Sequence, residues 1–166
     1  MTTEEAPVID PADFRRVLGH LPTGVTVVTA VADDQPAGVA IGSFASISLD
    51  PPLVGFFLGT QSASGAVISK AGGFCVNILA ADQLTLCGVM ASKADDKFDG
   101  VEWAAASGSG APILPDIVAY IDCSVEQIVE FGDHNLIVGR VLALDTASAE
   151  NPMVFYAGQY GTFGPA

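Results

Sequence analysis

Short apolar runs rich in β-branched residues recur along the chain, and they predict β-strands. They occupy residues 25–31, 38–44, 47–49, 53–58, 74–79, 117–131, 135–144 and 153–156. Turn-forming residues interrupt them, as in Asp33-Asp34-Gln35-Pro36 and Asp50-Pro51-Pro52. The run at 53–58 has no polar side chain, so we expect it to be buried on both faces. Only Gly132-Asp133-His134 separates the two longest runs, which predicts a hairpin.

Three further segments have the spacing of short helices. Asp10 predicts the N-cap of the first helix and Pro11 its first residue. Ser62 predicts the cap of a second helix over 62–70, and residues 82–91 predict a third. The apolar sets of the three helices are Phe14, Val17, Leu18 and Leu21; Ala66, Val67 and Ile68, expected on the inner side; and Leu84, Leu86, Val89 and Met90.

The order of these elements indicates the fold class. The strands follow one another through turns or single short helices, without the regular strand–helix alternation of a parallel sheet. The sequence therefore predicts a mainly β protein with short helices, built as an antiparallel barrel or sandwich. A length of 166 residues fits one domain. Residues 92–115 show little regular pattern and read as loop.

Charge and cysteine content narrow the possible partners and the compartment. The chain has 19 Asp and Glu against 6 Lys and Arg, a net charge of −13. Nucleic acid and anionic membranes are therefore not expected as partners, because both need clustered cations. The acidic start has no apolar segment like that of a secretory signal. Cys75, Cys87 and Cys123 are widely spaced and form no disulfide or zinc motif, so we expect a cytoplasmic protein with reduced thiols.

Several common catalytic and nucleotide-binding motifs are missing from the sequence. It has no GxGxxG after a strand, no GxxxxGK[ST], no GxSxG and no HExxH. Its two histidines, His20 and His134, exclude a His-rich metal site, and no metal is expected. Any nucleotide must therefore bind in some other way than in Rossmann folds or P-loops.

Three segments are unusually polar or small for their place, and they carry a resemblance. They read PTGVTVVT at 22–29, GVAIGSFASISLDPPL at 38–53 and GDHNLIVGRV at 132–141. Supporting pieces are FCVNIL at 74–79, KFDGVEW at 97–103 and FYAGQY at 155–160. In this order and spacing they resemble the short-chain flavin reductases that serve two-component flavin-dependent monooxygenases. The likeness extends over about residues 12–163 and implies their fold, the FMN-binding split barrel.

The resemblance also implies where a flavin would bind. A flavin needs small residues where its ring meets backbone, donors at the ring edge and hydroxyls near the phosphate; Gly42 and the serines of 43–48 supply these. Serines that merely face water on a half-exposed strand would look the same. The cofactor-binding residues implied by the family are Thr23, Gly24, Val25, Ile41, Gly42, Ser43, Phe44, Ser46, Ile47, Ser48, Ala80, Gln83 and Phe98.

By the same resemblance, His134 helps to place the nicotinamide. An imidazole can hydrogen-bond a carboxamide or a pyrophosphate oxygen, and Asp133 would orient it. A plain hairpin turn is the competing explanation, because Gly and Asp both favour turns. No catalytic acid or base is needed, since hydride passes between the two cofactors.

The expected function is therefore that of an NAD(P)H:flavin oxidoreductase. It would reduce FMN or FAD with NADH or NADPH and supply reduced flavin to a separate oxygenase. Members of the resembling family form homodimers, and we expect a homodimer here. Two alternatives stay open: another split-barrel oxidoreductase, either pyridoxamine-phosphate-oxidase-like or deazaflavin-dependent, and a non-catalytic flavin-binding module.

Overall fold

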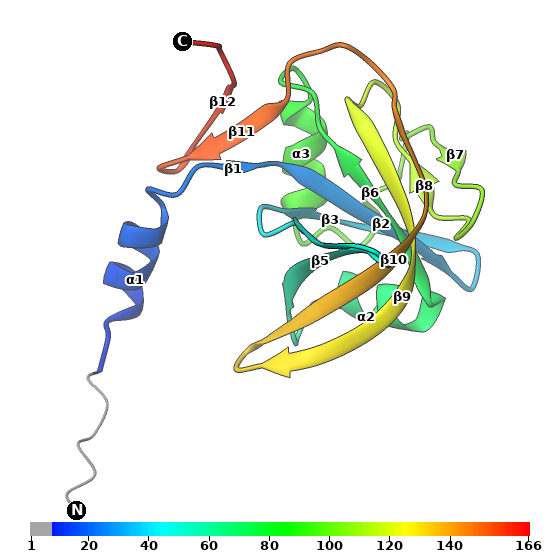
Figure 1. Ribbon diagram of the computed structural model, residues 1–166, viewed down its shortest axis with the longest axis horizontal. Helices are drawn as coiled ribbons and strands as arrows, with labels where there is room; N and C mark the ends of the chain where they lie inside the picture. The colour runs from blue at the N-terminus through cyan, green and yellow to red at the C-terminus, as the bar shows by residue number, and fades with distance from the viewer. Residues whose placement is uncertain (1–7) are drawn as a thin grey trace, which may run out of the picture.

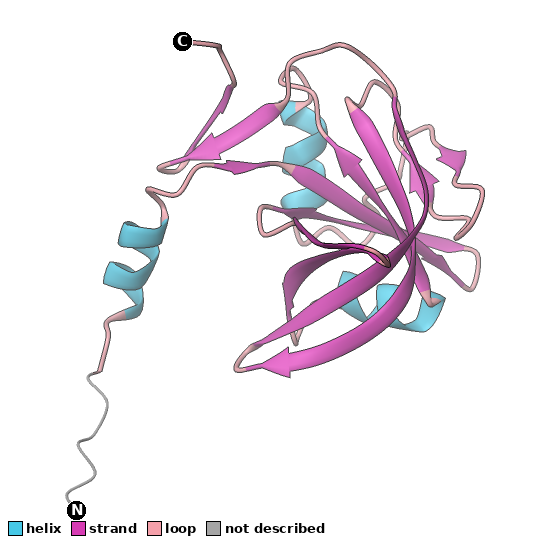
Figure 2. Cartoon of the chain, in the orientation of Figure 1, coloured by secondary structure: helices cyan, strands magenta, loops and turns pink. Residues whose placement is uncertain are grey.

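The computed structural model describes residues 8–166, in which strands predominate (Figures 1 and 2). Residues 1–7, which hold most of the acidic start discussed above, lie outside the described residues. The helices are α1 (Pro11–Leu18), α2 (Ala63–Ala71) and α3 (Leu84–Ala91). The strands are β1 (Thr23–Gly24), β2 (Thr26–Ala32), β3 (Gln35–Ile41), β4 (Ala45–Leu49), β5 (Pro52–Gly59), β6 (Gly73–Ile78), β7 (Ala104–Ala105), β8 (Pro112–Ile113), β9 (Ala119–Phe131), β10 (His134–Thr146), β11 (Met153–Tyr156) and β12 (Gln159–Thr162).

Seven strands form the main sheet, in the order β3-β2-β6-β9-β10-β5-β4, and all their pairings are antiparallel. The two edge strands, β3 and β4, follow each other in the sequence but do not pair. The sheet therefore curls without closing, and this open seam makes it a split barrel. The predicted fold class is confirmed.

The inside of the sheet is packed with large apolar side chains. Phe56 and Phe74 are completely buried there, and their rings meet edge to face with centroids 5.3 Å apart. Ile68 of α2 belongs to the same cluster, so α2 covers this core. Gly139 faces it too: a Cβ at that position would lie 2.3 Å from Phe74 Cζ, so only glycine fits between β10 and Phe74.

A second core lies between the sheet and α3. Cys87 and Met90, one turn apart on α3, pack with Leu79, Phe98 and Ile117. The predicted helix is present, but its predicted apolar set was partly wrong. Leu84 and Val89 are exposed, because the face of α3 that meets the sheet carries Cys87 and Met90 instead.

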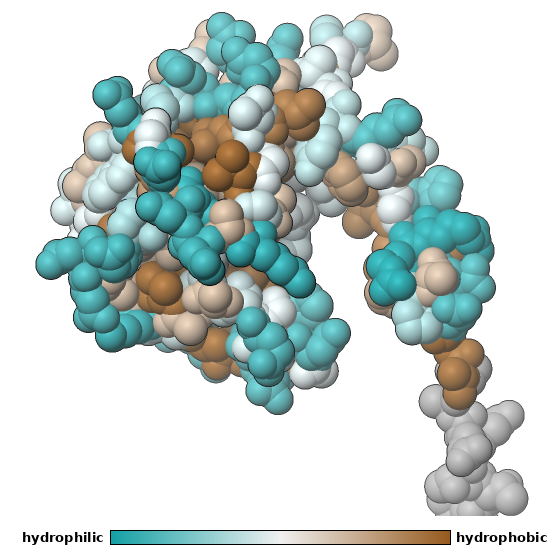
Figure 3. Space-filling model, turned by 180° about the vertical axis from the view of Figure 1, so that it is seen from behind, coloured by the Kyte–Doolittle hydropathy of each residue, from teal (hydrophilic) through white to brown (hydrophobic). Residues whose placement is uncertain are grey.

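An arm made of α1, β1, β11 and β12 extends away from the barrel (Figure 1). The caps predicted for α1 are confirmed: Asp10 accepts a hydrogen bond from the Ala12 N–H, and Pro11 begins the helix. Its apolar face also exists but packs against nothing in the part of the chain that the structure describes. Phe14, Val17 and Leu18 are each more than half exposed. The space-filling view in Figure 3 shows open space between this arm and the barrel.

Other elements differ from their predictions in where a strand begins or in which residue is buried. The turn before β3 is only Asp33-Asp34, both at positive φ, so the strand begins at Gln35 rather than Gly38. The β9–β10 turn is likewise only Gly132-Asp133, and His134 already belongs to β10. Ser62 caps α2 as predicted, yet Ala66 is exposed because α2 turns mainly Ile68 inward.

The prediction that 53–58 is buried on both faces was wrong at Phe57. The face of β5 that carries Phe57 is not covered within the described residues, and Phe57 is 43% exposed. The short strand β12 was not predicted at all. No helix among residues 8–166 combines the length and the apolar character needed to span a bilayer.

Candidate functional site

The predicted flavin segment lies at the open seam of the barrel. Among residues 8–166, strand β4 pairs only with β5, so the backbone N–H and C=O groups along its other edge have no partner strand there. Residues 42–44 lead into β4 from the end of β3. An unpaired edge of this kind offers backbone donors and acceptors to a ligand with a polar rim, as the resemblance requires.

Small residues gather where β1 meets the end of β3. Gly42 is exposed, and a Cβ there would lie 3.0 Å from the Thr23 Oγ1 atom. Gly24, next in β1, is exposed with nothing within 4 Å of where its Cβ would be. Val25 and Ile41 turn their side chains into the cores and offer only backbone at the surface. Because Gly24 leaves space that a side chain would otherwise fill, this junction fits a flat ring approaching the backbone.

Ser43 has a structural role in this seam. Its hydroxyl accepts a hydrogen bond from the Phe57 N–H at 3.0 Å and donates one to the Phe57 carbonyl at 3.2 Å. The serine thus ties the β3–β4 connection to β5 just beyond the end of β4. Phe44 packs against the inner core rather than lining an open surface.

The remaining residues of the segment divide between two faces. Ser46 is opposite Val54 and Ser48 is opposite Leu53, with a register shift between them that makes Ile47 a bulge. Since Val54 belongs to the inner core, Ser46 faces the inner side and Ser48 the outer side of the sheet. The Ile47 side chain covers Gly55, whose Cβ would lie 2.6 Å from Ile47 Cδ1. The serines therefore do not form one continuous row of donors.

His134 opens β10 and is held by its neighbour. Its Nδ1–H donates to Asp133 Oδ1 at 2.7 Å, and this hydrogen bond lowers the pKa of the Asp133 carboxyl. The Thr60 N–H donates to the Asp133 carbonyl at 3.0 Å, which fixes the turn against the end of β5. The ring keeps about half of its surface exposed, at 49%. His134 is thus oriented, and its Nε2 atom remains available to a ligand.

The register brings Ser43 and His134 to the same region. Phe57, to which Ser43 is bonded, is opposite Leu136, two residues from His134 on β10. Ser43 and His134 are therefore separated by two strand spacings, about 10 Å, across the sheet and by two residues, about 7 Å, along it. We define the outer face as the side of β5, β9 and β10 that points away from the inner core. It carries Phe57, Phe131, His134, Leu136 and, from β4, Ile47. No sequence motif points to Phe57 and Phe131 as site residues; their exposed rings have centroids 6.5 Å apart.

The other predicted residues lie on the α3 side of the sheet. Ala80 is buried just after the end of β6, and its N–H donates to Gln83 Oε1 at 3.0 Å. Gln83 in turn donates to the Pro115 carbonyl at 2.8 Å. Phe98 packs in the second core. Since Leu79 donates to the Val25 carbonyl, Ala80 is close to the β1–β3 junction, but the side chains of Gln83 and Phe98 are engaged in the fold.

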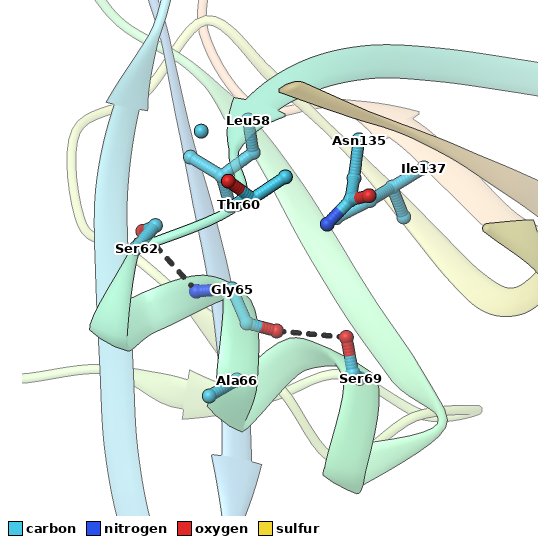
Figure 4. A pocket seen from close by; sticks show the side chains of 9 residues that line it. Leu58, Thr60, Ser62, Gly65, Ala66, Ser69, Asn135 and Ile137 are labelled. Carbon is cyan, nitrogen blue, oxygen red and sulfur yellow. Dashed lines mark hydrogen bonds between the residues drawn. The ribbon is translucent and has the colours of Figure 1, made fainter. Parts of the chain in front are cut away.

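A separate small cavity lies between β5, α2 and β10 (Figure 4). It is lined by Thr60, Ser62, Ser69 and Asn135, among others, and its volume is about 120 Å³. Sites for nucleotide-sized molecules are usually about 300–1,000 Å³. This cavity is therefore too small for a flavin, and the open seam is the better candidate.

Known proteins of one family are similar to this chain. The family model described as "Flavin reductase like domain" matches residues 18–164. A flavin reductase from Pseudomonas putida is 46% identical over 93% of this chain and 91% of its own length. The reductase subunit HsaB of a flavin-dependent monooxygenase from Rhodococcus jostii is also 46% identical, over 96% of this chain and 82% of its own.

Solved structures extend the likeness to three dimensions. Component B of a nitrilotriacetate monooxygenase from Mycobacterium thermoresistibile superposes with a TM-score of 0.89 at 40% identity, covering 93% of this chain and 87% of that one. The NADH:FAD oxidoreductase SgcE6 of Streptomyces globisporus, solved with NAD and FAD fragments, gives 0.88 at 36% identity over 96% and 98%. The resemblance inferred from the sequence is thereby confirmed, and this chain belongs to the flavin reductase-like family.

Proposed function

We propose that this chain is an NAD(P)H:flavin oxidoreductase that reduces FMN or FAD and releases the product to a separate oxygenase. The observation that carries the proposal is that His134 and the seam residue Ser43 lie on either side of β5, His134 being two residues from Leu136, the partner of the Phe57 to which Ser43 is bonded, on an open surface and not inside a closed cavity. A freely accessible site suits a flavin that enters, is reduced and leaves. Relatives named NADH-dependent FAD reductase and NADH-dependent FMN reductase support both flavins as substrates.

The residues of this chain bind and orient. When bound, the flavin supplies the centre that accepts a hydride from the nicotinamide. Thr23, Gly24 and Gly42 would receive the ring edge at the β1–β3 junction, and the free edge of β4 would provide backbone hydrogen bonds. His134, oriented by Asp133, would hydrogen-bond the nicotinamide carboxamide or a pyrophosphate oxygen. Correct placement of two reactants is by itself a large part of catalysis.

An activity assay tests the proposal directly. The purified chain is given FMN, FAD or riboflavin with NADH or NADPH, and oxidation of the nicotinamide is followed. We expect turnover that depends on added flavin. Flavin binding without nicotinamide oxidation would identify a binding module instead. Turnover only with a deazaflavin, or oxidation of pyridoxamine phosphate, would identify one of the other split-barrel activities.

The exposed apolar surface supports a homodimer as part of this proposal. The apolar face of α1 leaves Phe14, Val17 and Leu18 exposed, and monomers seldom leave such a contiguous apolar surface to water. We expect light scattering to give the mass of a dimer. Leu18→Glu should shift the mass toward the monomer, whereas Lys70→Glu, a charge change at a different exposed site, should not.

A cytoplasmic location belongs to the same proposal. Cys75, Cys87 and Cys123 are free thiols in the structure, as expected in a reducing compartment. The partner oxygenase would be a separate polypeptide, as the name of the HsaB relative, a reductase subunit, suggests for that protein.

A further inference from the structure

We propose that Arg140 binds the phosphate of the flavin nucleotide, and that Glu126 holds the guanidinium in place until the phosphate arrives. This inference rests on the proposed function. It adds a cation to a site in which the sequence predicts that hydroxyls and backbone amides do most of the anion binding.

The strand register places Arg140 beside the predicted flavin segment. Arg140 of β10 is opposite Leu53 of β5, and Leu53 is opposite Ser48 of β4. Directly paired residues share one face of a sheet, so Arg140 and Ser48 lie on the same face. They are on the two strands that flank β5. This is the outer face, which also carries His134 six residues earlier on β10.

The spacing along β5 suits a flavin nucleotide. Ser43 is bonded to Phe57, whereas Ser48 and Arg140 flank Leu53. Four residues of β5 separate these points, about 13 Å. A ribityl chain with its terminal phosphate reaches a comparable distance from the ring. A ring near Ser43 and His134 would therefore put its phosphate near Ser48 and Arg140.

Arg140 is the only Lys or Arg in β4, β5, β9 and β10. Most of the other cations are engaged at other places: Arg16 pairs with Asp13, and Lys70 pairs with Asp33. Lys97 donates to the carbonyls of Gly38 and Met90 at 3.1 and 2.8 Å. In a chain with a net charge of −13, a cation on this face stands out as a candidate for an anionic ligand.

Glu126 keeps the guanidinium positioned but exchangeable. The β9–β10 register shift skips Glu126, so its side chain is aimed at Arg140. The contacts are two parallel hydrogen bonds, Nε to Oε2 at 2.9 Å and Nη2 to Oε1 at 2.8 Å. Both side chains are about 40% exposed, at 41% and 39%, so water weakens the pair and a phosphate can compete for the guanidinium.

Binding measurements with two flavins test this directly, because riboflavin has no phosphate. We expect Arg140→Gln to weaken FMN binding about tenfold, as measured by quenching of flavin fluorescence, with riboflavin unchanged. Arg140→Lys should fall between, since it keeps the charge but loses the paired geometry. Glu126→Gln should tighten FMN, because it removes the competing carboxylate. Lys70→Gln, the matched loss of an exposed and paired cation, should change neither.

The outcomes separate this inference from the proposed function. Equal weakening of FMN and riboflavin by Arg140→Gln, or no weakening of either, would overturn the role of Arg140. So would an effect confined to the KM of NAD(P)H. If Arg140→Gln lowers the melting temperature, the comparison is made with Arg140→Lys and Glu126→Gln instead. Wild-type protein that binds flavins yet oxidises no NAD(P)H would contradict the proposed function and leave the phosphate site to be judged by binding alone.

Discussion

His134 shows how one hydrogen bond decides what a side chain can do. Asp133 binds Nδ1 and Thr60 fixes the turn, so the imidazole is presented with Nε2 outward. We expect His134→Ala to raise the apparent KM for NAD(P)H about tenfold while changing that for flavin much less, since one positioned hydrogen bond is lost. Steady-state kinetics with each substrate varied in turn measure both values.

His20→Ala is the matched control for that prediction. His20 also has its Nδ1 bonded at 2.9 Å, to the Arg16 carbonyl, but it lies on the arm. It should leave both KM values unchanged. Equal rises in the two KM values for His134→Ala would assign the residue to the stability of the site and not to nicotinamide placement.

At the level of single residues, the sequence predicted which residues are small and exposed better than it predicted what each side chain contacts. The glycines at 24 and 42 are exposed as a close approach requires. The hydroxyl of Ser43, by contrast, is engaged by Phe57, a residue 14 positions away. The neighbours of Phe57 and Arg140 could not be predicted, because they depend on strand register, which no local motif encodes.

Among elements, β10 illustrates how tightly the strands are packed. A Cβ at Gly139 would lie 2.3 Å from Phe74 Cζ and 2.9 Å from Cys123 Cβ. We expect Gly139→Ala to destabilise the protein by about 1–3 kcal/mol, because the inner core cannot make room without strain. Urea denaturation measures the change.

Gly88→Ala provides the opposite case on α3. Its Cβ would meet nothing within 4 Å, and the position is exposed within the helix. The Gly88→Ala substitution should stabilise the protein by about 0.5–1 kcal/mol, the usual advantage of alanine over glycine in a helix.

A Gly139→Ala protein as stable as the wild type would show that Phe74 moves freely, contrary to the packing described here.

Elements with strong local signals were predictable and those set by their partners were not. Asp10 with Pro11, and Ser62, marked the helix starts. The strand Met153–Tyr156 was predicted with its correct ends. By contrast, β12 is exposed throughout and holds its place by pairing with β11, so its own composition gave no sign of it. The buried face of α3 was predicted wrongly for the same reason, because packing against the sheet determines which side of the helix is buried.

For the molecule as a whole, two buried thiols tie stability to pH. Burial, with the nearby Asp122 carboxylate adding to it, raises the pKa of Cys75 and of Cys123 from 9.0 to about 12. Both thiols stay protonated in the folded chain but ionise near pH 9 in the unfolded one. The stability that the two protonated thiols give to the folded chain is therefore complete below pH 9, and it is lost as the pH rises from 9 toward 12.

We expect the free energy of unfolding to fall by about 1 kcal/mol per thiol between pH 8 and pH 10. Urea titrations at the two pH values measure the fall. A variant with both Cys75→Ala and Cys123→Ala is less stable at pH 8 but should lose less on going to pH 10. Equal losses in the variant and the wild type would mean that other groups cause the alkaline decline.

The burial of all three native cysteines has a practical consequence. Cys75, Cys87 and Cys123 are inaccessible in the folded chain, so maleimide dyes should leave the wild type unlabelled. One cysteine introduced at an exposed position, such as Glu130 on the β9 end of the hairpin, would then take a single fluorophore. Energy transfer between that dye and an arriving isoalloxazine would report docking in real time without removing any natural residue of the core.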